Sequence, residues 1–254
     1  LNFTRLRHIF ISHLHRDHCL GLPGLLSTLS LHQMGGTLTV HTFEEGAEIF
    51  SKMVDFFCRE RSFDLQFNIL DPTVRQTAVE TKSLIVEAFP LHHRVPTVGF
   101  LMREKPKQRH IIADAVKFFN VPVARMKDIK DGADFITPDG QVIANSRLTR
   151  DADPSASYAY CSDTLFDRTL ADVVKGVDLL YHEATYADDA TAKARERFHS
   201  TASQAARIAL AAEAKRLVIG HYSKAYKDES QHLEQARAIF PETILANEGL
   251  RLDI

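Results

Sequence analysis

The chain has 254 residues, of which 44% are hydrophobic and 25% are charged, and its formal net charge is −2. This composition is typical of one globular domain and excludes disorder, collagen and coiled coil. The near-neutral charge also excludes a globally basic nucleic-acid binder and leaves room only for a local basic patch. Histidine is unusually frequent, with 13 residues against 11 glycines and 6 tyrosines.

Strand-like and helical segments alternate along the chain, which indicates the α/β class. Apolar runs and alternating patterns predict strands at 9–11, 37–41, 83–91, 98–102, 158–161, 177–181, 216–220 and 243–245. Helical spacing predicts helices over 22–34, 44–59, 188–215 and 229–240, the third of them possibly broken near Ser200-Thr201. Residues 103–150 contain three prolines and only short periodic pieces, so we expect an insertion there.

The three cysteines are scattered and form no CxxC pair, which predicts packing roles rather than a disulfide framework or a zinc knuckle. No apolar run approaches the ~18 residues of a membrane span. We therefore expect a soluble protein of the cytoplasm that has no membrane partner.

The segment Ile11-Ser12-His13-Leu14-His15-Arg16-Asp17-His18 carries four potential metal ligands. His13 and His15 point to the same side of an extended chain because side chains alternate along it. Imidazole and carboxylate ligands without a thiolate favour zinc, and after it manganese or iron. A lone HxH pair would more often lie in an exposed loop, but four potential ligands between a strand and a helix favour a metal site.

Further polar side chains follow other predicted strands, where ligands collect in open α/β sheets. Asp163 is placed to bridge two metals, and His221 with one of His92 or His93 would complete their ligand sets. Two metal ions ~3.5–4 Å apart can activate water and stabilise both oxygens of an in-line displacement. The predicted chemistry is hydrolysis of a phosphodiester or of an activated acyl bond.

The HxHxDH motif at 13–18 is that of the metallo-β-lactamase fold superfamily, and later motifs narrow the resemblance. In order, they are HRVPTVGF at 93–100, YCSDT at 160–164, HEAT at 182–185, HST at 199–201 and GHYS at 220–223. From about Leu6 to Leu250 the chain resembles ribonuclease Z, the tRNA 3′-end processing endonuclease, in its short bacterial form.

The resemblance implies a four-layer αββα sandwich over residues 1–254 and two zinc ions per subunit. It implies one metal held by His13, His15 and His93, a second held by Asp17, His18 and His221, and Asp163 bridging them. His93 is chosen over His92 because the family's ligand stands seven positions before an aromatic residue, here Phe100. His92 is then a surface residue or a support for a ligand.

The resemblance also implies catalytic roles for Asp17, Glu183 and His199. Asp17 would accept a proton from the attacking water, and His199, supported by Glu183, would protonate the leaving 3′-oxygen. For His182 a functional role and a buried, backbone-bonded side chain are equally compatible with the sequence. The remaining histidines are expected at the surface or at helix caps; they are His8, His32, His41, His110 and His232.

The insertion supplies the cations that an RNA substrate needs. Residues 103–130 contain three acidic residues and eight cationic ones. The cationic residues are Arg103, Lys105, Lys107, Arg109, Lys117, Arg125, Lys127 and Lys130. In short-form ribonuclease Z an arm that grips tRNA protrudes from this position; the alternative is a solvated charged loop. A Gly-Pro element usual in that arm is replaced by 120–124, Arg16 stands where glycine is usual, and Cys161-Ser162 replaces Ser-Gly.

The expected activity is zinc-dependent cleavage of precursor tRNA, which removes the 3′ trailer and leaves a 3′-hydroxyl. The alternatives are another hydrolase of this fold, such as a small phosphodiesterase or thioesterase, and a catalytically silent RNA-binding homologue. The family is typically a homodimer. Because the chain begins at Leu1, and ribonuclease Z normally has two or more strands before its metal motif, we expect about fifty residues upstream, still a single domain.

Overall fold

The structure is a computed structural model that describes residues 5–254, so Leu1 lies outside the described residues. The chain divides into two compact units. The first runs to Glu80 and includes Ile85–Met102 and Ser157–Ile254, and the second consists of Thr81–Leu84 and Arg103–Ala156.

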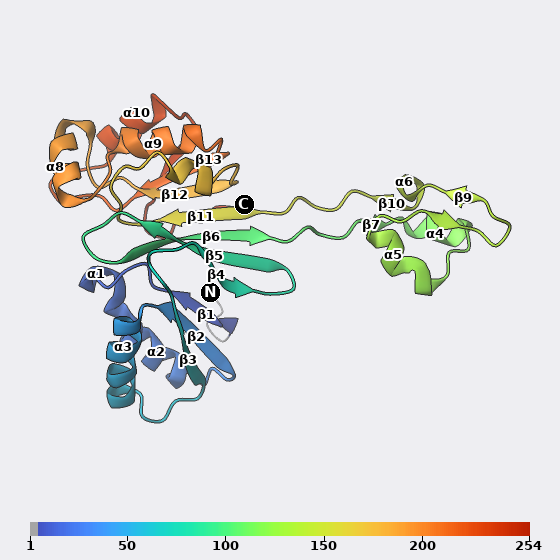
Figure 1. Cartoon of the computed structure of the whole chain (residues 1–254), viewed down its shortest axis with the longest axis horizontal. Coiled ribbons are helices and arrows are strands. Elements are labelled where there is room, and N and C mark those ends of the chain that lie inside the picture. The colour runs from blue at the N-terminus through green and yellow to red at the C-terminus, as the bar shows by residue number, and fades with distance from the viewer. Residues whose placement is uncertain (1–4) are drawn as a thin grey trace. The chain divides into compact units, whose positions relative to one another are not determined.

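The larger sheet of the first unit has seven strands (Figure 1). In spatial order they are β14 (Thr243–Leu245), β13 (Arg216–Gly220), β12 (Leu179–Glu183), β11 (Ser157–Cys161), β6 (Thr97–Glu104), β5 (Leu84–Leu91) and β4 (Gln76–Glu80). Strands β11 to β14 pair in parallel. Their apolar side chains pack with those of the helices α7 (Leu170–Val173), α9 (Ala202–Ala211) and α10 (Ser230–Arg237) into one core.

The smaller sheet has three parallel strands, β1 (His8–Phe10), β2 (Thr37–Thr42) and β3 (Asp64–Ile69). Its helices are α1 (Arg16–Cys19), α2 (Gly21–Leu31) and α3 (Glu44–Phe57). The amphipathic α3 buries Phe50 and Val54 in a core that also contains Leu26, Leu29 and Leu38.

The two sheets lie next to each other, with helices on the outer side of each (Figure 1). Phe10 of β1 contacts Phe100 of β6, with 5.0 Å between ring centroids. The Val98 amide of β6 donates to the Ser12 carbonyl, which follows β1. The α/β class and the αββα layers predicted from the sequence are confirmed.

The predicted break in the alanine-rich helical stretch is also confirmed. The chain forms a short 3₁₀ turn, η3 (Asp188–Ala190), then α8 (Thr191–Arg197), and starts again with α9. Thr201 caps α9 through a capping box: its hydroxyl accepts from the Gln204 amide, and the Gln204 side chain accepts from the Thr201 amide. The restart of the helix places His199 in the connection between two helices.

Outside the insertion, two of the described strands were not predicted from the sequence, namely β3 and β4. Both are edge strands of their sheets, and half-buried and exposed positions dominate them. From Asp64 to Ile69, β3 alternates polar and apolar residues, a pattern typical of a half-buried strand, so the sequence carried a signal for β3 that the prediction missed. In β4 the polar and apolar residues do not alternate, so it has no such signal.

The prediction that His41 and His232 are surface or cap residues is wrong, because both are almost fully buried. His41 accepts a hydrogen bond from the Asn68 amide group at 2.9 Å and lies 3.1 Å from the Nδ1 atom of His8. Its ring stacks on Phe10. His232 packs edge-on against two tyrosine rings. Their burial depends on segments distant in sequence, which local pattern does not show.

The second unit has its own small core, formed by Val121, Ile129, Phe135, Ile143 and Leu148. Its elements are short: β7 (His110–Ile111), α4 (Ala113–Phe118), η2 (Val123–Arg125), α5 (Met126–Lys130), β8 (Phe135–Ile136), β9 (Val142–Ile143), α6 (Asn145–Leu148) and β10 (Thr149–Arg150). The insertion is therefore a folded unit with a buried interior. Across residues 5–254, the helices are too short or too polar to cross a membrane.

The buried His41 predicts a pH-dependent stability. Burial first, and then the neighbouring His8, lower the pKa of His41 to about 4 in the folded chain, whereas an exposed histidine titrates near ~6.5. The unfolded chain therefore binds the extra proton, so this stabilisation is complete above pH ~6.5 and is lost as the pH falls toward 4, by about 3 kcal/mol in all.

We expect His41→Gln, which keeps polar groups but does not titrate, to flatten the fall of the urea midpoint between pH 7 and 4. His32→Gln at an exposed position is the control and should keep the wild-type slope. An unchanged slope in His41→Gln would show that the buried ring does not govern acid stability.

Candidate metal centre

The loop after β1 brings three imidazoles and one carboxylate to the edge of the sheets. His13 is fully buried, and α1 carries Asp17 and His18 onto the same side. The side chain of Asp17 remains 69% exposed, whereas that of His18 is 14% exposed. One short segment thus supplies both a buried and a solvent-facing group of donors.

The other donors follow strands of the seven-stranded sheet. His93 lies two residues after β5, Asp163 two residues after β11, and His221 directly after β13. Burial of these strands in the core fixes the starting point of each connection. All seven residues predicted as metal ligands are brought together in this way.

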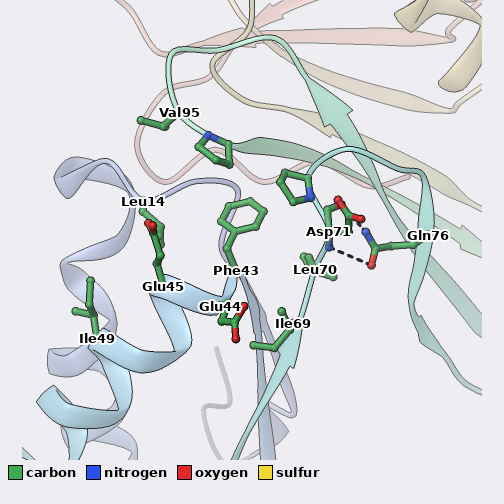
Figure 2. A pocket seen from close by; sticks show the side chains of 12 residues that line it. Leu14, Phe43, Glu44, Glu45, Ile49, Ile69, Leu70, Asp71, Gln76 and Val95 are labelled. Atoms are coloured by element: carbon green, nitrogen blue, oxygen red, sulfur yellow. Dashed lines mark hydrogen bonds between the residues drawn. The ribbon is translucent and has the colours of Figure 1, made fainter.

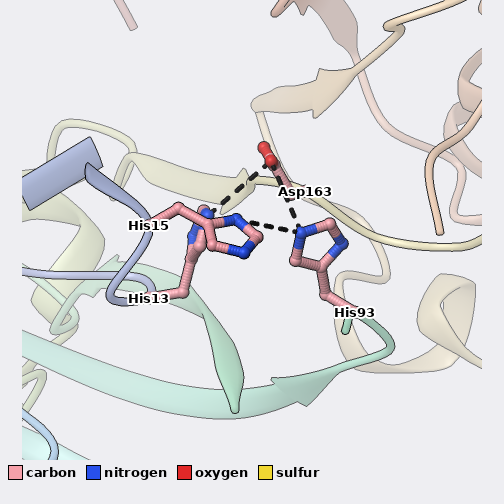
Figure 3. A group of neighbouring side chains, drawn as sticks. All are labelled: His13, His15, His93 and Asp163. Carbon is pink, nitrogen blue, oxygen red and sulfur yellow. Dashed lines mark hydrogen bonds and ion pairs between the residues drawn. The ribbon is translucent and has the colours of Figure 1, made fainter. Parts of the chain in front are cut away.

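The Asp163 carboxylate faces the imidazoles of His13 and His93 (Figure 3). Its Oδ2 atom is 3.7 Å from His13 Nε2, 3.6 Å from His18 Nε2 and 3.8 Å from His93 Nε2. Its Oδ1 atom is 3.4 Å from His221 Nε2. The carboxylate therefore lies within 4 Å of imidazoles from both predicted ligand sets, His13 and His93 of one and His18 and His221 of the other.

Several imidazoles are held through the nitrogen that points away from Asp163. The Nδ1 atom of His13 is 3.1 Å from the Ser12 hydroxyl, and that of His93 donates to the Phe198 carbonyl at 2.9 Å. His221 Nδ1 is 2.7 Å from the Thr185 hydroxyl. Such contacts fix the ring orientation and the tautomer of a metal-binding histidine.

Burial favours the neutral form of three of these imidazoles, which is the form that coordination requires. Burial first, and then the neighbouring His18, lower the pKa of His13 to about 3. Burial also lowers the pKa of His18 and of His93 below the usual value. The lowered pKa favours the neutral form of His13, His18 and His93, and a neutral imidazole has one ring nitrogen with a free lone pair.

The residues fit a metal. His13 Nε2 is a buried atom that makes no hydrogen bond within residues 5–254, and it faces Asp163. Potential ligand atoms lie within 4.8 Å of one another in three overlapping groups: His13, His15, His93 and Asp163; Asp17, His18 and His221; and Asp163, His199 and His221. An orphaned imidazole nitrogen beside a buried carboxylate is the environment that a divalent cation completes.

Glu183 and His199 form a buried pair beside these donors. His199 Nδ1 is 2.9 Å from Glu183 Oε1, and Glu183 has no exposed surface. Burial alone would lower the pKa of His199, but the hydrogen bond and charge of Glu183 outweigh it, so the pKa of His199 is raised above its usual value. His199 can therefore carry a proton at neutral pH.

The other histidines near the centre face away from it. His92 is exposed and pairs with Asp167 at 3.0 Å. His182 is fully buried inside β12 and its Nδ1 atom bonds the Glu183 carbonyl, so of the two alternatives for this residue the structure shows the backbone-bonded one. Arg16 begins α1 with an exposed side chain.

The cationic residues predicted to bind RNA all lie in the second unit. Lys107 pairs with Glu104, Arg109 with Asp151 and Arg125 with Asp128. Lys117 and Lys127 are exposed, as are Phe118 and Val123 near them in sequence.

Some residues at the centre were not singled out from the sequence. A cavity of about 270 Å³ opens beside the metal-binding group, and Arg94, Tyr186 and Arg197 line it together with His199. Arg94 directly follows the ligand His93, so its position along the chain was an available signal. Thr185 ends the HEAT motif at 182–185, but the motif alone does not show that its hydroxyl contacts His221.

Two residues at the centre have a left-handed backbone although neither is glycine. Phe198 has φ 59° and ends α8, and His221 has φ 62° and follows Gly220 of β13. The left-handed turn at Phe198 lies directly before His199, and its carbonyl is the one that binds His93. Strained backbone of this kind is concentrated at functional sites.

The metal-binding loop is anchored from its far side by Leu14. Leu14 lines a separate cavity of about 780 Å³ with Phe43, Ile49 and Ile69, and none of the lining residues is a histidine (Figure 2). It also packs on Gly46 in α3: a methyl group added at Gly46 would lie 2.9 Å from Leu14 Cδ2 and overlap the Thr42 hydroxyl. Because residue 46 is glycine, the Leu14 side chain of the metal-binding loop can pack closely against α3.

The fold is shared with solved structures. The chain aligns with human tRNase Z, short form, at TM-score 0.66 and 24% identity, covering 98% of this chain and 80% of that one. It aligns with a metallo-beta-lactamase fold protein of Bacillus subtilis at TM-score 0.63 and 15% identity, covering 98% and 78%. The layers therefore have the metallo-β-lactamase fold, and the His/Asp centre in them is a candidate metal-binding site.

Curated relatives specify the family. Ribonuclease Z of Parabacteroides distasonis is 50% identical over 254 residues, which is all of this chain and 84% of the relative. Ribonuclease Z of Bacteroides fragilis is 50% identical over 256 residues, with the same coverage. The chain belongs to the ribonuclease Z family. No family model matches it.

We expect Gly46→Ala to destabilise the fold by about 1–3 kcal/mol, the usual cost of overpacking a filled site, and to weaken zinc binding because Leu14 is displaced between two donors. Urea denaturation and competition with a chromogenic chelator measure the two effects. Gly24→Ala is the matched control: it lies in α2 with nothing within 4 Å, so stability should rise by about 0.5–1 kcal/mol. Wild-type behaviour of Gly46→Ala would refute the anchoring role of Leu14.

Proposed function

We propose that the chain is a metal-dependent endoribonuclease that hydrolyses precursor tRNA at its 3′ end, removes the 3′ trailer and leaves a 3′-hydroxyl on the tRNA. The observation that carries the proposal is the His/Asp metal-binding group in a chain that is 50% identical to proteins named ribonuclease Z. The raised pKa of His199 beside that group supplies a proton donor for a leaving oxygen.

The proposed cofactor is a pair of zinc ions, with manganese or iron as alternatives. His13, His15 and His93 would hold one ion, Asp17, His18 and His221 the other, and Asp163 would bridge them. The donor set supports zinc because it combines imidazoles and carboxylates without a thiolate. When bound, the ions supply a nucleophilic water at neutral pH and neutralise charge that develops on the phosphodiester.

The chain's own residues account for the proton transfers. The Asp17 carboxylate is largely exposed and lies 3.7 Å from His18, so it is placed to accept a proton from the attacking water. His199 and Asp17 both line the cavity of about 270 Å³ beside the metal-binding group. From there His199 donates its proton to the leaving 3′-oxygen. Glu183 favours the protonated form of His199 and orients its ring through the hydrogen bond to Nδ1.

The second unit is proposed to bind tRNA away from the cut, as an arm inserted at 103–150 in one metallo-β-lactamase-like domain of residues 1–254. Its exposed Lys117 and Lys127, with the exposed Phe118, support contacts to phosphates and bases. Arg109 and Arg125 pair with exposed acids and Lys107 with the half-buried Glu104, so phosphate can compete most readily for the two arginines. Arg103, Lys105 and Lys130 complete the proposed set.

We also propose a homodimer and a cytoplasmic location. The family resemblance supports both, and the three buried cysteine thiols suit a reducing compartment.

The decisive experiment is a cleavage assay on precursor tRNA with and without a chelator. We expect a product with a 3′-hydroxyl, loss of cleavage with chelator, and no cleavage by His15→Ala, because removal of one donor empties a metal site. If metal-loaded protein left precursor tRNA intact but hydrolysed a small ester, the chain would be another hydrolase of this fold. If it bound tRNA without any cleavage, it would be a silent RNA-binding homologue.

For the arm, we expect the double variant Lys117→Ala/Lys127→Ala to raise KM for precursor tRNA while hydrolysis of a bis-aryl phosphate stays at the wild-type rate. Each lost phosphate contact should also reduce the salt dependence of binding, by ~0.7–0.9 in the log–log slope. Lys52→Ala, which removes an exposed lysine on α3, is the control. Equal loss on both substrates would mean that these lysines support the fold and do not contact RNA.

A further inference from the structure

One hydroxyl lies between the metal-binding group and the Glu183–His199 pair. Thr185 Oγ1 is 2.7 Å from His221 Nδ1, 2.7 Å from Glu183 Oε2 and 3.2 Å from His199 Nδ1. The Thr185 side chain is buried, with 6% of the residue exposed. A potential ligand and both members of the acid pair therefore meet at one side-chain atom.

The donors around Glu183 determine which group gives the proton in each contact. Glu183 Oε1 accepts from the amides of Thr164 and Ser200 and from His199 Nδ1. Glu183 Oε2 accepts from the Thr185 amide at 2.9 Å. Because both oxygens already face N–H donors, Glu183 acts as a carboxylate acceptor, and the Thr185 hydroxyl must donate to it.

The same hydroxyl then has only lone pairs left for His221. His221 Nδ1 must carry the proton and donate it to Thr185 Oγ1, so its Nε2 atom has the free lone pair. Nε2 is the atom that faces Asp163 at 3.4 Å. Thr185 thus selects the tautomer of His221 that can bind a metal.

We propose that Thr185 is a positioning residue that joins the ligand His221 to the acid pair, so that one hydroxyl sets both the metal-binding tautomer and the position of the proton donor relative to the metals. This inference rests on the proposed function of the centre. It concerns the hydroxyl and not the bulk of the side chain, because the backbone amide of Thr185 holds Glu183 independently.

The test compares three substitutions at this position. Thr185→Val replaces the hydroxyl by a methyl group and keeps the branched shape. Thr185→Ala removes the hydroxyl and the methyl group and adds no atoms. Thr185→Ser keeps the hydroxyl and removes the methyl group. Thr243→Val is the matched control, because Thr243 is equally buried and its hydroxyl donates to the Phe240 carbonyl, away from the centre. Zinc affinity is measured by competition with a chromogenic chelator, and kcat and KM on precursor tRNA.

We expect zinc affinity about 10–100-fold weaker in Thr185→Val and Thr185→Ala, with kcat lowered and KM for precursor tRNA close to wild type. Thr185→Ser should restore both quantities, and Thr243→Val should bind zinc normally. If Thr185→Val does not fold, as judged by circular dichroism, Thr185→Ala decides.

Three results would overturn the inference: wild-type zinc affinity in the variants that lack the hydroxyl, equal loss in Thr185→Ser, or equal loss in Thr243→Val. The zinc measurement does not depend on the substrate. If wild-type protein failed to cut precursor tRNA, the proposed function would fail, while the affinities would still decide the role of Thr185.

Discussion

A carboxylate buried among imidazoles is the interaction on which the rest of the centre depends. Asp163 is 2% exposed and lies within 4 Å of four histidines. A buried charge without compensation is costly, and neutral imidazoles alone compensate it only weakly, so the centre is built to be completed by cations. Asp163 follows β11. The connections after β5 and β13 and the loop after β1 place their histidines around its carboxylate.

Orientation is the second requirement, and the structure meets it with groups behind the ligands. The Ser12 hydroxyl, the Phe198 carbonyl and the Thr185 hydroxyl each bind the outer nitrogen of one imidazole. Two of these groups lie beside His199 or contact it, so the metal-binding side and the proton-donating side share their supports. A disturbance of the connection between α8 and α9 would therefore reach both sides of the reaction.

The sequence predicted the parts of the centre that have a local pattern. The spacing of His13, His15, Asp17 and His18 is visible in one segment, and strand-end positions pointed to Asp163 and His221. Burial of His41 and the meeting of Thr185 with His221 are set by packing between distant segments, so no local pattern encodes them. The alternation of polar and apolar residues in β3 was visible in the sequence but not used, whereas β4 has no alternating pattern.

The left-handed backbone of His221 has an evolutionary consequence. Among residues other than glycine, Asn, Asp and His enter this conformation most readily. Position 221 is therefore restricted twice, by ligand chemistry and by backbone shape, and the few residues that satisfy the backbone include two further metal ligands, Asp and Asn. A substitution at 221 that keeps both this backbone and a ligand atom is thus limited to Asp or Asn, whereas no left-handed backbone restricts His13.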